Sequence, residues 1–241
     1  SISSGAGALA VGNALSITAS GASVNVQSIA VGAGGVSNQG SLTVAAGSSV
    51  AGDVTTSGTL TFSSALTLSV GGSWSSTGTF ATGGGLLDFT RNGSVTFLAP
   101  VTVAAGGSLG VLARDITVAS DIRLPGGRLT LEARSILNER LGAVTVAPGT
   151  TLSVRGEWVN DFLPAGSGAP TRSAFLDAGA ITLRSAGELR LGSRDGTTVQ
   201  AAVLDAVGGG WIDPSGRILA GRGGDVTLVA GGDVLLAAKM L

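Results

Sequence analysis

The stretch GSLTV at residues 40–44 contains the pattern on which the rest of the chain is built. It returns as GTLTF (58–62), GSVTF (93–97), GRLTL (127–131), GAVTV (142–146), GAITL (179–183) and GDVTL (224–228). The third and fifth residues are apolar, and the fourth is threonine every time. Because side chains alternate between the two faces of a strand, the apolar pair should face a core and the threonine solvent. The leading glycine marks the bend before each strand.

The spacing of these copies indicates a coil made of short strands. The copies that begin at Gly40 and Gly58, and a weaker copy at Gly78, follow one another at a nearly constant interval. Second strands, such as GELRL at 187–191, begin soon after a copy, here the one at 179–183. A repeat this short leaves no room for a helix in every turn, so the sequence predicts an all-β parallel β-helix (β-solenoid) with about 20 residues per rung.

Two further expectations follow from this repeat. The span from Gly179 to Gly224 is close to two such periods. A single rung buries too few apolar side chains, at roughly 1.5–3 kcal/mol each, to offset the ordering of its backbone at roughly 1–2 kcal/mol per residue. The rungs should therefore stack into one column without an internal hollow, with Leu129 and Leu131 inside and Arg128 outside.

Composition fits a thin coil and excludes several classes of site. Glycine supplies 41 of the 241 residues, and charged residues make up 12%. The chain has no cysteine and no histidine, which removes disulfides, thiol nucleophiles and the usual proton shuttle. We therefore predict no catalytic residue, no metal site and no cofactor. A net charge of −1 gives no field that favours nucleic acid.

The sequence also bears on membranes and export. No apolar run is long enough to span a membrane as a helix, so we expect no stable membrane insertion. The stretch 1–20 lacks the basic start and apolar centre of a signal peptide. If the protein is exported, we expect this chain to be an internal or processed segment of a longer coil.

Two stretches interrupt the rhythm of what is otherwise predicted to be one continuous β-helix over 1–241. Residues 155–178 read as an excursion loop from a corner of the coil, with Trp158, Phe162 and Phe175 packing back on its side wall. Residues 205–223 form a second irregular stretch, DAVGGGWIDPSGRILAGRG. Loops on a rigid scaffold often carry function, so these stretches hold the candidate binding residues.

The candidate binding residues form one group in each irregular stretch. They are Trp158, Asp161 and Arg172 in the first, and Trp211, Asp213, Arg217 and Arg222 in the second. In the second group, Trp211 could stack on a sugar ring while the charged groups bond hydroxyls. The first group could contact a partner. The alternative is a purely structural corner, in which tryptophan covers the coil and Asp213 caps a turn before Pro214.

Several phrases resemble large exoproteins of the filamentous haemagglutinin kind, which Gram-negative bacteria secrete by the two-partner route. The phrases are WVND (158–161), LDAGAITL (176–183) and GGGWIDPSGRILAGRGGDVTL (208–228). The resemblance implies a right-handed β-helix that forms part of an adhesin shaft, secreted or on the bacterial cell surface. It also implies an outer-membrane transporter as partner during secretion, and a host-cell receptor or glycan as the adhesive partner.

Alternatives remain open at this point. An autotransporter passenger would carry the same coil, and coils of this kind can also associate end to end or laterally. A polysaccharide-processing enzyme on a β-helix would need clustered carboxylates, and stacked rungs could bring together Asp177, Asp205 and Asp225. Three or more carboxylates in one groove would favour that enzyme.

Overall fold

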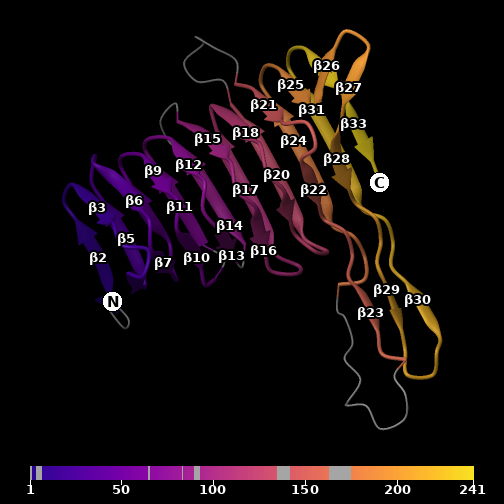
Figure 1. Ribbon diagram of the computed structural model, residues 1–241, viewed down its shortest axis with the longest axis horizontal. Helices are drawn as coiled ribbons and strands as arrows, with labels where there is room; N and C mark the ends of the chain where they lie inside the picture. Colours follow the sequence, from indigo (N-terminus) through magenta and orange to yellow (C-terminus); the bar gives the residue numbers. More distant parts are fainter. Residues whose placement is uncertain are drawn as a thin grey trace.

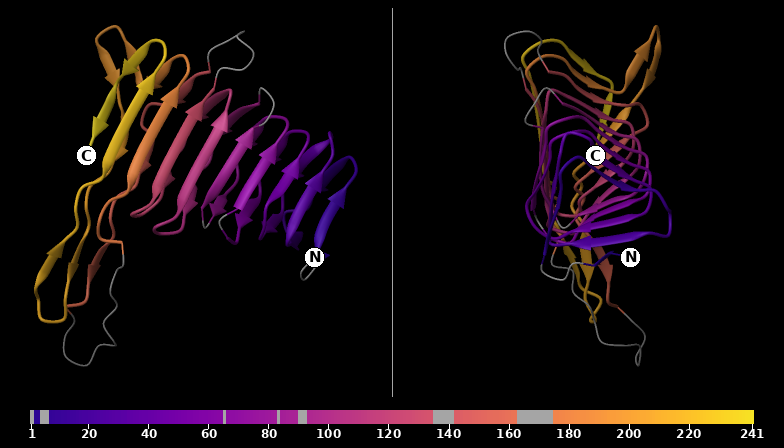
Figure 2. Two further views of the ribbon diagram at one scale, coloured as in Figure 1. Left: turned by 180° about the vertical axis from the view of Figure 1, so that it is seen from behind. Right: turned by 90° about the vertical axis from the view of Figure 1, so that its left-hand side faces the viewer.

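The computed structural model describes residues 2–3, 7–64, 66–82, 84–89, 93–134, 142–162 and 175–241. Within these residues the regular structure is all strand, with no helix. Three long parallel sheets run the length of the molecule and form the sides of a three-sided column (Figures 1 and 2). The predicted parallel β-helix is confirmed.

Each rung places one strand in each of the three sheets, which we call sheets A, B and C. Sheet A contains β1 (Ile2–Ser3), β4 (Ser23–Val26), β7 (Ser41–Val44), β10 (Thr59–Phe62), β13 (Phe80–Thr82), β16 (Val101–Val103), β19 (Ile122–Arg123), β22 (Thr151–Ser153), β28 (Ala202–Asp205) and β33 (Ala238–Met240). Sheet B contains β2 (Ala8–Val11), β5 (Ser28–Val31), β8 (Ser48–Val50), β11 (Leu66–Val70), β14 (Gly85–Phe89), β17 (Ser108–Ala113), β20 (Arg128–Ala133), β24 (Ala180–Ser185) and β31 (Asp225–Ala230). Sheet C contains β3 (Ala14–Ile17), β6 (Gly35–Asn38), β9 (Val54–Thr56), β12 (Trp74–Ser76), β15 (Ser94–Phe97), β18 (Asp115–Val118), β21 (Val144–Val146), β25 (Leu189–Leu191) and β32 (Val234–Leu236).

Two small sheets lie outside the column. One is the three-stranded sheet of β23 (Trp158–Asn160), β29 (Gly210–Ile212) and β30 (Ile218–Ala220). The other is the antiparallel hairpin of β26 (Ser193–Asp195) and β27 (Thr198–Gln200). Both project from the part of the column nearest the C-terminus (Figure 1).

The alternation read from the sequence sets the inside and the outside of the column. Leu129 and Leu131 are fully buried and Arg128 is exposed, as predicted. The same holds for Leu42 and Val44, which are buried on either side of the half-buried Thr43. The repeated phrase is not confined to one side, because it supplies β7 of sheet A, β20 of sheet B and β21 of sheet C. The phrase therefore specifies a strand and its facing, and not a position in the rung.

Rung length follows from the pairing of successive strands. Leu60 pairs with Leu42 of the rung before it and with Phe80 of the rung after it. The length of each of these rungs is therefore close to the predicted length of about 20 residues. The interpretation of residues 179–224 as two rungs is wrong. Ala180 pairs directly with Asp225, so these residues form a single rung enlarged by insertions at its corners.

The interior is filled mainly by aliphatic side chains and one aromatic cluster. Phe62 packs edge-on against Phe80 with ring centroids 5.0 Å apart, and Phe80 packs against Trp74 at 5.3 Å. Such edge-to-face pairs add to the free energy gained from burial alone. Trp74 also lies 6.4 Å from Phe97 of the next rung, so the cluster links consecutive rungs of sheets A and C.

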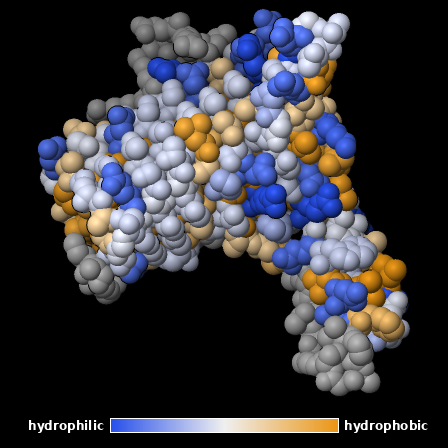
Figure 3. All heavy atoms as spheres, in the orientation of Figure 1, coloured by the Kyte–Doolittle hydropathy of each residue, from blue (hydrophilic) through white to orange (hydrophobic). Residues whose placement is uncertain are grey.

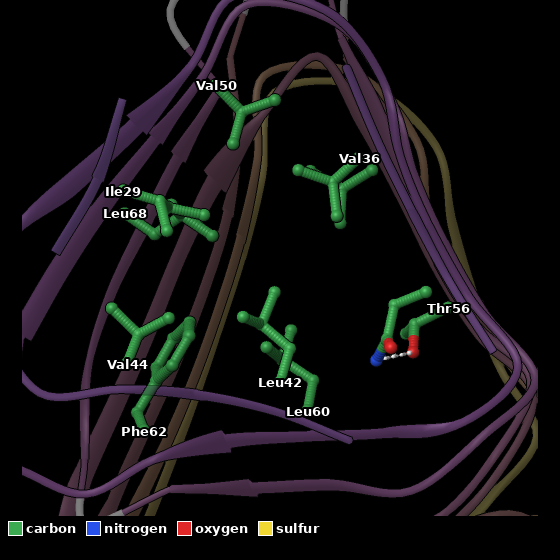
Figure 4. A pocket seen from close by; sticks show the side chains of 11 residues that line it. Ile29, Val36, Leu42, Val44, Val50, Thr56, Leu60, Phe62 and Leu68 are labelled. Carbon is green, nitrogen blue, oxygen red and sulfur yellow. Dashed lines mark hydrogen bonds between the residues drawn. The ribbon is translucent and has the colours of Figure 1, made fainter. Parts of the chain in front are cut away.

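One small gap in the packing lies near the N-terminal end of the column. A void of about 10 Å³ lies inside the rungs between Ile29 and Leu68. Figure 4 shows the space among Val36, Val50, Leu42 and Thr56. Val54 lines the void where the next rung has Trp74, and Thr56 lines it in the row of paired residues that later contains Phe97. The volume of the void is close to that of one water-sized probe.

Candidate functional site

The three-stranded sheet outside the column is built from both irregular stretches, and we call it, with the turn at 213–217, the arm. The first insertion joins β22 of sheet A to β24 of sheet B, and the second joins β28 of sheet A to β31 of sheet B. Because β22 pairs with β28 and β24 with β31, the two insertions leave the same corner of consecutive rungs. Their strands therefore start side by side, and β23 pairs with β29 in parallel.

The foot of the arm is a close crossing of backbone segments. The amide of Glu157 donates to the carbonyl of Phe175 at 2.6 Å, and the amide of Gly209 donates to the carbonyl of Leu176 at 2.7 Å. A Cβ atom on Gly209 would lie 1.9 Å from the carbonyl oxygen of Glu157. Glycine in the GGGW phrase is therefore required so that the two insertions can approach each other and turn outward together.

Trp211 and Asp161 connect the two insertions through their side chains. The indole Nε1 of Trp211 donates to Oδ2 of Asp161 at 2.6 Å, and Asp161 is 4% exposed. The amide of Asp161 also donates to the carbonyl of Ile212. A buried carboxylate needs hydrogen-bond donors, and the indole of Trp211 supplies one to Asp161, so this pair stabilises the arm.

Asp213 closes the turn between β29 and β30. Its Oδ1 accepts hydrogen bonds from the hydroxyl of Ser215 at 2.6 Å, from the amide of Ser215 and from the amide of Arg217. Its Oδ2 accepts from Nε of Arg217 at 3.1 Å. The hydroxyl of Ser215 and the amide of Arg217 lower the pKa of Asp213 below its ordinary value of 3.8, although desolvation opposes them. The structural interpretation of Asp213 as a turn cap is confirmed.

Trp158 differs from Trp211 because most of its ring faces solvent. It is 62% exposed, and its six-membered ring lies directly over Gly210, where a Cβ atom would be 2.1 Å from Cζ3. Phe162 is 59% exposed and lies beside Gly216. The prediction that Trp158 and Phe162 pack back on the side wall is wrong for both. It holds for Phe175, whose ring covers Gly106 and whose Cβ lies against Gly126, both at corners of the column.

The remaining candidates are placed differently. Arg222 lies at the foot of the arm, where its amide donates to Oδ1 of Asp177 at 2.6 Å and the residue is exposed. Arg172 lies outside the described residues. The structure therefore brings Trp158, Asp161, Trp211, Asp213 and Arg217 together on the arm, and it separates Arg222 from them.

An open groove of about 510 Å³ runs past the foot of the arm over the starts of four sheet B strands. Its floor is rich in glycine, and Arg128, Asp177, Arg222 and Asp225 lie along it. Asp205 does not line this groove. Its carboxylate accepts from Nε of Arg155 at 2.9 Å and from the hydroxyl of Ser153. Of the three carboxylates considered for an enzyme, two line the groove.

The described residues lack two other kinds of feature. No group of three or more acidic side chains there has the arrangement needed to hold a metal ion. None of the described segments forms a helix with the length and apolar character to cross a membrane.

Sequence reasoning missed three residues that shape the exposed side of the arm, namely Asn160, Gly210 and Ile218. Gly210 pairs with Trp158, which belongs to the preceding rung, and Ile218 pairs with Ile212. The phrase GGGWI gives no local signal that its last glycine supports a tryptophan from another rung.

Comparison of the chain with models of protein families, with curated proteins and with solved structures found no match.

Proposed function

We propose that this chain is a shaft segment of a secreted or cell-surface filamentous bacterial adhesin, and that the arm is its adhesive part. The observation that carries the proposal is the construction of the arm. Two consecutive rungs extend the same corner into one folded sheet that projects from the column (Figure 1). Segments that project from a rigid scaffold are common places for binding residues, which favours the arm as the adhesive part.

The sequence resemblance supports the same function. Of the phrases that carry the resemblance to filamentous haemagglutinin-like exoproteins, WVND and the part GWIDPSGRILA (210–220) lie in the strands and the turn of the arm. LDAGAITL leads into β24 and the final GDVTL into β31, both in sheet B of the column. An outer-membrane transporter during secretion and a receptor or glycan at the target surface are the partners that this proposal requires.

The experiment compares the whole chain with a variant that lacks the arm. Residues 155–179 and 207–224 are each replaced by Pro-Gly-Gly, the corner that 125–127 make in the rung before. Val154 and Ala206 then occupy the buried position that Leu124 has in that rung.

We expect the whole chain to bind cultured epithelial cells and the armless variant to lose that binding, while both show the same strand content by circular dichroism. Equal cell binding by the two proteins, or no binding by the whole chain, would reduce the segment to a spacer.

A further inference from the structure

We infer that Trp158 is a stacking platform for a sugar ring, so that the ligand of the arm is a glycan. This inference rests on the proposed adhesive function and names the ligand class of that site. It transfers the role of the sugar-binding tryptophan from Trp211, whose N–H group is bonded to Asp161, to Trp158.

The two faces of the arm sheet differ in character. Residues that pair across the three strands share a face, and these are Trp158 with Gly210 and Ala220, and Asn160 with Ile212 and Ile218. This set contains no charged residue. The opposite face carries Trp211 and the acidic residues Asp161 and Asp213, whose carboxylates are buried and bonded to donors within the arm. The uncharged face is therefore the one that can meet a ligand without breaking the bonds that hold the arm together.

The platform is held in place from below. Because Gly210 has no side chain, the ring of Trp158 rests against its backbone, and the opposite side of the indole faces solvent. A fixed ring loses little conformational freedom on binding. Its electron-rich face attracts the weakly positive C–H groups on one side of a pyranose ring.

Asn160 supplies a polar group on the same face. Its Oδ1 accepts a hydrogen bond from the amide of Phe162 at 3.0 Å, which fixes the carboxamide. The N–H groups of that carboxamide remain as donors for a sugar hydroxyl. A flat aromatic ring beside an oriented amide satisfies both sides of a sugar, the apolar C–H face and the hydroxyl rim.

The size of the face also favours a glycan over a protein. Three strands about 4.8 Å apart, each with three residues of about 3.3 Å, give a face of about 14 Å by 10 Å. A stable protein interface needs about 800 Å² on each partner, several times this area. Hydrophobic side chains on the arm include Ile218, which is 62% exposed, and Figure 3 shows hydrophobic residues on the arm as well as on the column.

The test measures binding of cellobiose and lactose to the whole chain by saturation-transfer NMR and calorimetry. We expect both disaccharides to bind through the C–H face of one ring, and sorbitol, which has the hydroxyls without the ring, not to bind. Trp158→Ala and Trp158→Leu should each weaken binding at least about tenfold. The leucine variant separates a flat platform from general apolar contact.

The matched control is Val199→Ala, because Val199 is 57% exposed on the β26–β27 hairpin and is not part of the arm. It should leave the affinity unchanged, and all three variants should melt like the unchanged chain. Full affinity in Trp158→Ala or Trp158→Leu, equal binding of sorbitol, or no binding of either disaccharide would overturn the inference.

Failure of this inference can be told from failure of the proposed function. If the arm is required for cell binding but Trp158→Ala binds cells normally, the glycan platform is overturned and the adhesive function stands. If periodate oxidation of the cell-surface glycans leaves binding intact while Trp158→Ala abolishes it, the partner is a protein and the inference is overturned. If the armless variant binds cells as well as the whole chain, the proposed function itself fails.

Discussion

The indole N–H of Trp211 donates a 2.6 Å hydrogen bond to the carboxylate of Asp161, a residue 50 positions earlier in the chain. These two side chains come from insertions in consecutive rungs. Their contact therefore joins two segments that depend on the column to bring them together, and the arm should be stable only when the rungs beneath it are paired.

Asp161→Ala should loosen the arm and leave the column intact. The substitution removes the carboxylate that accepts from the half-buried Trp211 N–H group, and a hydrogen bond to a charged group contributes about 1.5–3 kcal/mol. Hydrogen exchange measured by mass spectrometry should speed up in β29 and β30 and stay unchanged in β20 and β24. Asp195→Ala, at an exposed position of the other hairpin, is the control and should change neither region. Unchanged exchange in the arm of Asp161→Ala would show that the pair is not stabilising.

The turn of the arm should open in acid because of Asp213. Its pKa lies below the ordinary value of 3.8, chiefly because the hydroxyl of Ser215 and the amide of Arg217 donate to the carboxylate. The folded turn thus binds a proton more weakly than the unfolded turn, so it is stabilised above pH 3.8 and loses this stabilisation as the pH falls through the lowered pKa. Amide exchange of residues 215–219, followed from pH 6 to pH 2.5, should show the opening. Asp213→Asn should remove this pH dependence, and its persistence in that variant would assign the acid sensitivity to another group.

The facing of β20 predicts opposite effects for two neighbouring positions. Leu131 is fully buried between Val111 and Leu183 of the adjacent rungs, so Leu131→Asp places an unpaired charge in the core and should prevent stable folding. Leu131→Ala should cost about 2–5 kcal/mol. Arg128→Ala, on the outer face of the same strand, should change stability by no more than about 0.5 kcal/mol. Thermal melts would contradict this facing if the three variants unfolded at similar temperatures.

The internal void near the start of the column can be filled. Val36 lines it, and Val36→Ile adds one carbon where space exists, so we expect a gain of up to about 1 kcal/mol. Val111→Ile makes the same chemical change in a fully buried rung away from the void and should cost about 1–3 kcal/mol. Denaturant unfolding measures both. A loss of stability in both variants would mean that the void is not available to a larger side chain.

Gly210→Ala tests the support of Trp158 without changing the tryptophan itself. The new Cβ would lie 2.1 Å from the ring, so the indole must swing away from the arm while the column stays folded. We expect the fluorescence of Trp158 to become more accessible to acrylamide and disaccharide binding to fall. Gly223→Ala, where a Cβ meets only the carbonyl of Ala206 at 3.7 Å, is the matched control. Normal sugar binding in Gly210→Ala would show that the ring does not need its glycine support.

Sequence reasoning could reach the fold because the β-helix is specified locally. The alternation within each copy of the phrase shows which side chains point inward. Leu129 and Leu131 can therefore be assigned to the core, and Arg128 to the surface, without knowing which strands they pair with. Rung boundaries were harder, because a corner can hold a single residue, as at Gln27, or the whole insertion between Ser153 and Ala180. For this reason the spacing of the glycines suggests two rungs over residues 179–224, whereas the structure has one.

From the sequence alone, the candidate site is visible only as two separate stretches. Nothing local distinguishes Trp158, which is exposed, from Trp211, which is hydrogen-bonded to Asp161. That distinction depends on Gly210 lying beside Trp158, and the pairing of these two residues follows from two insertions that leave the same corner.

Alternation and glycine bends act over a few residues and require no distant partner, so the amino-acid pattern alone specifies a column of short strands. The union of the two irregular stretches into one arm, with Trp158 as its exposed ring, depends instead on contacts between rungs. The stacking of β22 on β28 and of β24 on β31 sets the distance between the two insertions, and neither contact is encoded in the stretch that it positions.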